Sequence, residues 1–308
     1  MAKIMIFFKK PILCLSLLFL ITASPAMAST TDDDAATDLD SIITMGNEYM
    51  AKGEPEKAIN EYNMVLSRQT DNAGVHLQRG IAYGMLRQTS KSISDINKCL
   101  EIKPNFPEAY YSRAKVYEMR NDKDKAIQDY SKAIELQADY AQAYYNRGVI
   151  YFRKGIPDLA LADYQSAIRI DPNYYKAYFN LGLVYRGKGN NDLAIRSYTR
   201  ALEIKPDFKE AYFNRGRTYY DMDDYSAAVA DFRKVVEIDP KYADGHYSLA
   251  ATLEWIQEKH EAADYYEKYI KYAPPEDSVR VRKIKLKIVE LRDKPSKMAP
   301  GEIKEGKK

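Results

Sequence analysis

Small and apolar residues recur along this chain at a fixed spacing of 34 positions. Within each 34-residue repeat, positions 4, 8 and 11 share one face of a helix, and positions 20, 24 and 27 share one face of a second helix. Gly or Ala at position 8 and Ala at position 20 let the two backbones approach closely, while Tyr or Phe at position 24 fills the remaining space. Pro at position 32 ends the second helix. The pattern predicts an all-α chain of helix pairs.

The repeats follow one another without an insertion from residue 39 to residue 276. Position 32 is Pro172, Pro206, Pro240 and Pro274 in the last four repeats, and position 8 is glycine in five repeats. We therefore divide the chain into seven repeats, here numbered 1 to 7: 39–72, 73–106, 107–140, 141–174, 175–208, 209–242 and 243–276.

The fifth repeat shows the pattern almost completely. It carries Tyr178, Leu181, Gly182, Tyr185, Ala194, Tyr198, Ala201 and Pro206. This order of residue types resembles the tetratricopeptide repeat. The resemblance implies a right-handed superhelical solenoid of seven helix-turn-helix units, whose first helices line a concave groove where ligands bind. It also implies a non-enzymatic protein whose partner is a protein or an extended peptide.

A second pattern pairs opposite charges between the two helices of a repeat. Four repeats have Arg at position 7 and Asp at position 23, whereas Leu181 and Leu249 at position 7 are matched with Ser197 and Tyr265. We predict a structural bridge between the two helices, because breaking a buried ion pair costs ~3 to 5 kcal/mol. A catalytic or ligand-binding series of aspartates is the weaker interpretation. The predicted pairs are Arg79 with Asp95, Arg113 with Asp129, Arg147 with Asp163 and Arg215 with Asp231.

Candidate binding residues lie at the positions that face the groove implied by the family resemblance. Position 6 is Asn in three consecutive repeats, and similar Asn series in some members of the family hold the backbone of an extended peptide. Asn offers both a donor and an acceptor. A polar helix surface is the alternative for the Asn series, and packing between repeats is the alternative for the aromatic series at position 5. The predicted peptide-binding residues are Asn146, Asn180, Asn214, Tyr111, Tyr145, Phe179, Phe213, Lys176, Arg186 and Arg217.

The two ends differ from the repeats. Residues 1–28 combine three lysines, an apolar stretch and small residues before a cleavage site after Ala28, which predicts a secretory signal peptide. An uncleaved anchor is the alternative, although the apolar stretch is shorter than the ~20 residues that span a bilayer. We expect residues 29–38 to form an acidic linker, 277–293 to form a helix that caps the last repeat, and 294–308 to form a basic disordered tail.

Charge and cysteine content narrow the possible partners. The chain has 47 Lys and Arg against 44 Asp and Glu, and three of the lysines lie in the predicted signal peptide. The exported chain is then neutral overall, which gives no field that would attract nucleic acid. The segment from Asp277 onward is basic, so a weak contact with an anionic envelope surface is an alternative to a solvated tail. Cleavage leaves Cys99 alone, and we expect it to be a core residue.

No motif predicts catalysis. The three histidines, His76, His246 and His260, lack metal-ligand spacing, and no glycine-rich phosphate loop occurs. We therefore expect no enzyme, no cofactor and no metal, and predict an exported, periplasmic or secreted, interaction scaffold that binds its partner in the groove. An envelope-associated adaptor that uses its basic C-terminal end, or an accessory subunit of a separate cell-wall or glycosyl-transfer enzyme, remain alternatives. Self-association is left open.

Overall fold

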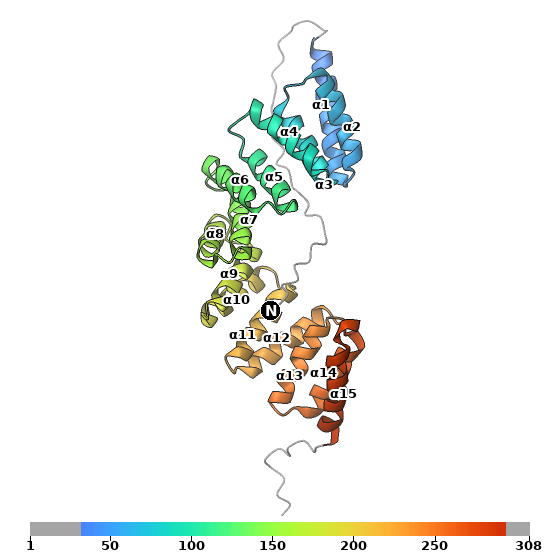
Figure 1. Cartoon of the computed structure of the whole chain (residues 1–308), viewed down its shortest axis with the longest axis vertical. Coiled ribbons are helices and arrows are strands. Elements are labelled where there is room, and N and C mark those ends of the chain that lie inside the picture. Colours follow the sequence, from blue (N-terminus) through green and yellow to red (C-terminus); the bar gives the residue numbers. More distant parts are fainter. Residues whose placement is uncertain (1–31, 294–308) are drawn as a thin grey trace, which may run out of the picture. The chain divides into compact units, whose positions relative to one another are not determined.

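A computed structural model describes residues 32–293 of this chain (Figure 1). These residues form helices and contain no β-strand. The signal peptide predicted for 1–28 and the tail predicted for 294–308 lie outside the described residues. Among the residues described, no helix is long and apolar enough to cross a membrane.

The helices alternate between two series that follow the sequence period. From α3 onward, each first helix begins 34 residues after the previous one, and the second helices keep the same spacing throughout. The first helices are α1 (Asp32–Lys52), α3 (Ala73–Met85), α5 (Pro107–Met119), α7 (Ala141–Arg153), α9 (Tyr175–Gly187), α11 (Lys209–Asp221) and α13 (Ala243–Trp255). The second helices are α2 (Pro55–Arg68), α4 (Thr89–Ile102), α6 (Lys123–Leu136), α8 (Pro157–Ile170), α10 (Asn191–Ile204), α12 (Tyr225–Ile238) and α14 (Lys259–Tyr272).

The chain divides within α7 into two compact blocks, Met1–Ala143 and Tyr144–Lys308. In the described part of the N-terminal block, α1 packs on α2, α3 on α4 and α5 on α6. In the described part of the C-terminal block, α9 packs on α10, α11 on α12 and α13 on α14. Second helices also contact the first helix of the following pair, as α10 does with α11 and α12 with α13. Each block is therefore a stack of helix pairs.

The core of a helix pair is a large ring packed on a small residue. Tyr198 at position 24 is fully buried, and a methyl group added at Gly182 would lie only 2.5 Å from its Cε1 atom. Gly216 and Phe232 repeat this arrangement one pair later, with 2.9 Å from the added carbon to the ring. An added methyl group at these glycines would press on the ring, which explains why position 8 holds only the smallest residues, Gly in five repeats and Ala in two.

A left-handed residue ends every first helix. Position 15 of all seven repeats has a positive φ between 57° and 78°, where a side chain is normally disfavoured. Glycine occupies this position in only three repeats. The residues are Gly53, Arg87, Asn121, Gly155, Gly189, Asp223 and Gln257.

Helix α1 begins earlier than the sequence predicted. It starts at Asp32, so residues 32–38 of the predicted acidic linker form its first turns instead. Two alanines favour the helix, and the acidic residues 32–34 lie at its N-terminus, where the helix dipole favours negative charge.

The last helix, α15 (Ser278–Asp293), follows a short 3-10 helix, Pro275–Asp277. It packs on α14 and buries Ile284, Ile288 and Leu291 in the same cluster as the core of the last repeat. Val281 packs against this cluster and is partly buried. The apolar face that α14 would otherwise expose is thereby covered.

Candidate functional site

The arginine and aspartate series of the sequence forms two-point ion pairs. In repeat 2, Nε and Nη2 of Arg79 each donate to one carboxylate oxygen of Asp95, and both distances are 2.7 Å. The equivalent distances in the other three pairs lie between 2.7 and 2.9 Å. The aspartates are buried and the arginines are nearly so. Both oxygens of each carboxylate accept a hydrogen bond from the arginine of the same repeat, which is the geometry of the predicted structural bridge.

The structure adds an acceptor that the sequence analysis missed. Nη1 of Arg79 donates to Asn63 Oδ1 at 2.7 Å, and Asn63 lies at position 25 of the preceding repeat. Arg113 contacts Asn97 at 2.7 Å and Arg215 contacts Thr199 at 2.8 Å in the same way. Arg79, Arg113 and Arg215 therefore each join their own two helices and also join two neighbouring repeats.

The electrostatics of the pairs agree with a structural role. Burial raises the pKa of Asp163 and Asp231, and the arginine beside each of them counteracts that rise. The hydrogen bonds to Asp95 and Asp129 raise the pKa of Arg79 and Arg113. The charge on each side chain depends on its partner, which is typical of a buried ion pair.

The three predicted asparagines do not form one uniform row. All three are half-buried, but Asn180 Nδ2 donates to the hydroxyl of Tyr145 at 3.2 Å, whereas Asn214 Nδ2 donates to the Glu210 carbonyl of its own helix at 2.8 Å. Asn146 is placed on α7 with the same degree of burial. The amide oxygen of Asn214 has no hydrogen-bond partner within the described residues, and its geometry leaves that oxygen available to an external donor.

The predicted aromatic series packs within its own repeats. Phe179 lies 5.8 Å from Tyr198 and 4.9 Å from Phe208, measured between ring centroids. The other members likewise contact the rings at positions 24 and 34 of their repeat: Tyr111 with Tyr130 and Tyr140, Tyr145 with Tyr164 and Tyr174, and Phe213 with Phe232 and Tyr242. Each residue of the series is half-buried, so part of its surface is open to a ligand.

The three predicted basic residues have different surroundings. Arg186 donates from Nη2 to Asp221 at 2.6 Å, and its buried Nε has no hydrogen-bond partner. Arg217 is exposed, forms no ion pair in the described part of the chain, and lies 5.9 Å from the Phe213 ring. Lys176 is half-buried, with Nζ 5.9 Å from the Tyr175 ring.

Two tyrosine hydroxyls on the second helices α8 and α10 are buried and form no hydrogen bond within the described residues. The hydroxyl oxygens of Tyr164 and Tyr198 are both buried and unpaired. Burial raises the pKa of Tyr198, while Arg186 and Arg217 lower it, so both guanidinium groups are close enough to act on this hydroxyl. The sequence could not reveal these atoms, because position 24 is a buried packing position in every repeat, aromatic in six of them and Ile96 in repeat 2.

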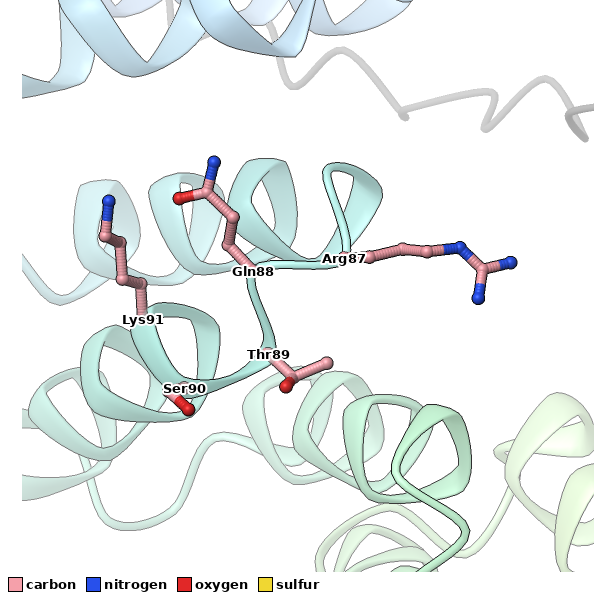
Figure 2. A pocket seen from close by; sticks show the side chains of 5 residues that line it. All are labelled: Arg87, Gln88, Thr89, Ser90 and Lys91. Atoms are coloured by element: carbon pink, nitrogen blue, oxygen red, sulfur yellow. The ribbon is translucent and has the colours of Figure 1, made fainter.

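Groups suited to catalysis do not converge in the described residues. No cluster of three His, Cys, Asp or Glu that could hold a metal ion occurs between residues 32 and 293. Cys99 is fully buried, and burial raises the pKa of its thiol to about 11. A depression of about 290 Å³ at the α3–α4 turn is lined by the consecutive residues 87–91. Figure 2 shows that Arg87 points away from Gln88 and Lys91, so the turn offers no convergent site.

Comparisons with known proteins agree with this geometry. Models described as TPR repeat or tetratricopeptide repeat match residues 96–128, 119–155, 141–174, 175–208 and 210–242. Helix pairs with a 34-residue period, stacked by small residues and buried rings, define a class of helical repeat proteins. The chain belongs to the tetratricopeptide repeat family. A search of curated proteins gave no significant match.

Solved structures show the same fold. The C-terminal part of a TPR repeat-containing protein from Cytophaga hutchinsonii is 18% identical with a TM-score of 0.66, covering 79% of this chain and 98% of that chain. YrrB, described as a TPR protein with an unusual peptide-binding site, is 24% identical with a TM-score of 0.53, covering 64% and 97%. MamA is 32% identical with a TM-score of 0.49, covering 52% and 94%.

Proposed function

We propose that this chain is an exported, non-enzymatic scaffold that binds a protein or an extended peptide on the face formed by its first helices. The observation that carries the proposal is a pair of buried polar atoms, the hydroxyl of Tyr198 on α10 and Nε of Arg186 on α9, that form no hydrogen bond within the described residues. The exposed guanidinium of Arg217 on α11, which forms no ion pair in the described part of the chain, acts on the same hydroxyl. A buried polar group without a hydrogen bond costs about 1 to 3 kcal/mol. A ligand that brings carbonyl or carboxylate oxygens would satisfy these donors.

The asparagines extend this surface along the chain. Asn180 on α9 and Asn214 on α11 occupy the same position of consecutive repeats, and their first helices are in contact. An amide side chain can pair with the backbone of a peptide whatever the peptide's side chains are. YrrB has a peptide-binding site on a fold of the same kind. The family is typically non-enzymatic, which supports a role in binding.

Export is proposed from residues 1–28 alone. Intact-mass analysis of the protein recovered from outside the cytoplasm should show a chain that begins at Ser29. A mass that still includes Met1 would remove this part of the proposal.

The adaptor alternative places the contact at the basic C-terminal end. Three basic residues of α15 are engaged within the protein, because Arg280 pairs with Asp277, Lys287 with Glu254, and Arg292 with Asp264 and Glu267. These ion pairs reduce the charge that α15 can offer to an outside surface. The first-helix face is therefore the better supported surface.

The test begins with a random peptide library selected on the full chain, which supplies a defined ligand. Replacing Asn146, Asn180 and Asn214 together by Ala should weaken binding of that peptide at least tenfold in calorimetric titration, because three bonds of ~1 kcal/mol are lost. The helices should persist, since Ala is the better helix former. Asn190→Ala is the matched control, because Asn190 lies before α10 and makes no capping bond.

A deletion at the C-terminus separates the alternatives. Removal of residues 294–308 should leave peptide binding unchanged. If the triple variant binds like the wild type and the shortened chain does not bind, the contact lies at the basic end and the proposal is wrong.

A further inference from the structure

A cavity of about 420 Å³ lies between α12, α13 and α14 of the C-terminal block. Its walls come from the second helix of repeat 6 and from both helices of repeat 7. The size falls in the range of small-molecule sites. The lining residues that matter below are Arg233, Glu237, His246, Tyr265, Lys268 and Lys271.

The histidine of this cavity has an unused ring nitrogen. His246 is 97% buried, and its Nε2 lies 2.9 Å from the carbonyl oxygen of Pro240. A carbonyl only accepts, so Nε2 carries the hydrogen and Nδ1 of the neutral ring has a free lone pair. Nδ1 is buried and has no partner. The ring itself is fixed by stacking against Tyr265 and Tyr272, at centroid distances of 5.9 and 5.8 Å.

Repeat 2 shows what this nitrogen lacks. His76 occupies the same position there, and its Nε2 also lies 2.9 Å from a carbonyl oxygen, that of Thr70. Its Nδ1 also forms no hydrogen bond, but it lies 3.5 Å from a carboxylate oxygen of Asp95. In repeat 7 the residue at the position of Asp95 is Tyr265. Repeat 7 therefore keeps the histidine without the carboxylate.

Three basic side chains line the cavity that holds His246: Arg233, Lys268 and Lys271. Lys268 Nζ lies 4.3 Å from the centroid of the Tyr265 ring, and neither Lys268 nor Lys271 forms an ion pair in the described part of the chain. The one acidic lining residue, Glu237, is paired with Lys234 at 2.8 Å, and Arg233 is paired with Glu261 at 2.7 Å. The cavity thus has two cations, Lys268 and Lys271, that no ion pair within residues 32–293 neutralises.

We propose that this cavity binds a carboxylate, which pairs with Lys268 and Lys271 and occupies the place beside His246 that Asp95 holds beside His76. The carboxylate belongs either to a free small organic acid or to an acidic side chain of a partner. A carboxylate is recognised here by two ammonium groups and a ring nitrogen, which are charge-assisted donors. Apart from His246 on α13, the lining residues named here lie on the second helices α12 and α14, and the proposal does not depend on the proposed function.

Binding of the carboxylate is coupled to protonation of His246 at Nδ1. A carboxylate repels a lone pair, so Nδ1 takes up one proton from solvent and becomes a donor when the carboxylate enters. The charged groups around the ring are Arg233 and Glu237 from α12, Asp239 after that helix, and Lys268 and Lys271 from α14. Affinity should therefore rise as pH falls from 8 to 6.

The chain's three histidines make the test direct. The full chain is labelled with ¹⁵N in its histidines, and the ring signals are followed during titration with succinate. The His246 signals should shift and saturate with a dissociation constant of about 1 mM or lower, the strength of a small ion-paired ligand. The signals of His76 are the internal control and should not move. Succinamide, which has the same shape without charge, should cause no shift.

Two variants test the residues named. Lys268→Gln with Lys271→Gln should weaken succinate binding at least tenfold, and both are exposed side chains whose loss leaves the helices intact. Tyr265→Asp returns a carboxylate to the position that Asp95 holds in repeat 2, and should also reduce succinate binding. The pair of lysine substitutions decides the result if the Tyr265 variant does not fold.

The outcomes are distinct. If acetyl-glutamate amide shifts His246 as succinate does, the site accepts an acidic side chain of a partner. If only succinate binds, the ligand is a free organic acid. If succinate leaves the His246 signals unmoved up to about 50 mM, or the lysine variant binds like the wild type, the proposal is wrong.

Discussion

The guanidinium of Arg215 and the hydroxyl of Thr199 join two neighbouring repeats through a 2.8 Å hydrogen bond from Nη1 to Oγ1. The other two donors of the same guanidinium hold both oxygens of Asp231 at 2.7 and 2.8 Å. One side chain therefore sets the spacing within a helix pair and also the spacing between pairs. The two bonds to Asp231 explain why Arg at position 7 is always found with Asp at position 23 in this chain.

The first prediction concerns the coupling within the pair. Arg215→Leu alone should lower the free energy of unfolding by about 3 to 5 kcal/mol, because Asp231 is left charged and buried without its partner. Arg215→Leu combined with Asp231→Ser should cost clearly less, since repeat 5 carries Leu181 with Ser197 at these positions. A double-mutant cycle in urea measures the difference. Additive losses would show that the two side chains do not interact.

The second prediction concerns the link between repeats. Thr199→Val keeps the shape of the side chain and removes the acceptor of Arg215 Nη1, so we expect a loss of about 1 kcal/mol in unfolding free energy. In the Arg215→Leu background the same substitution should have no effect, because the donor is absent. Chemical denaturation of the four proteins gives both numbers. A loss of equal size in both backgrounds would assign the effect to packing of the valine.

Sequence periodicity was sufficient to predict the helix pairs and the pairing of Arg at position 7 with Asp at position 23. It could not reveal the third member of the bridge, because position 25 is Asn63, Asn97 and Thr199 in different repeats and these side chains share only an acceptor oxygen. Where position 7 is Leu249, position 25 of the preceding repeat is Arg233, which accepts nothing. Because the residue type at position 25 differs between repeats, its common role as an acceptor for the arginine is seen only in the contacts.

The candidate binding residues were harder to predict for a different reason. Asn180 and Asn214 occupy equivalent positions, yet one amide donates to a tyrosine and the other to its own helix. Asn180 donates to the hydroxyl of Tyr145 at position 5 of the preceding repeat, whereas the equivalent residue for Asn214 is Phe179, which has no hydroxyl. The periodic pattern treats these two aromatic residues as alike. The unpaired hydroxyl of Tyr198 could not be predicted either, because the pattern at position 24 indicates only that the ring packs in the core.

The third prediction uses the left-handed residue at the end of each first helix. Gln257 has a φ of 69°, a conformation that costs a residue with a side chain about 1 kcal/mol and costs glycine almost nothing. Gln257→Gly should therefore raise the unfolding free energy by a few tenths to about 1 kcal/mol, after the entropy of glycine in the unfolded chain is included. Thermal and urea denaturation measure the change.

Gly189→Ala is the matched opposite substitution. Gly189 has a φ of 78° and no atom within 4 Å of the added carbon, so the backbone conformation alone is affected. We expect a loss of about 1 kcal/mol. A gain in stability at residue 189, or a loss at residue 257, would contradict the assignment of strain to position 15.

The last prediction concerns acid stability. Burial lowers the pKa of His246, Lys268 lowers it further, and the hydrogen bond to Pro240 and the charge of Asp239 only partly oppose this. Below the ordinary histidine pKa of about 6.5, the unfolded chain therefore binds a proton that the folded chain resists binding. Stability should fall as pH falls through that range. His246→Tyr removes the titrating group and matches position 4 of repeats 3 to 6, which all carry tyrosine.

The comparison is made as a difference, because carboxylates also titrate in acid. The wild type should lose more unfolding free energy than His246→Tyr between pH 7.5 and pH 5, whatever their relative stabilities at pH 7.5 are. Urea denaturation at both pH values gives the four numbers, and succinate must be absent from the buffer, because the proposed site would bind it and raise the pKa of His246. Equal losses in the two proteins would show that His246 keeps its ordinary pKa in the folded chain, and that the free Nδ1 position is open to water.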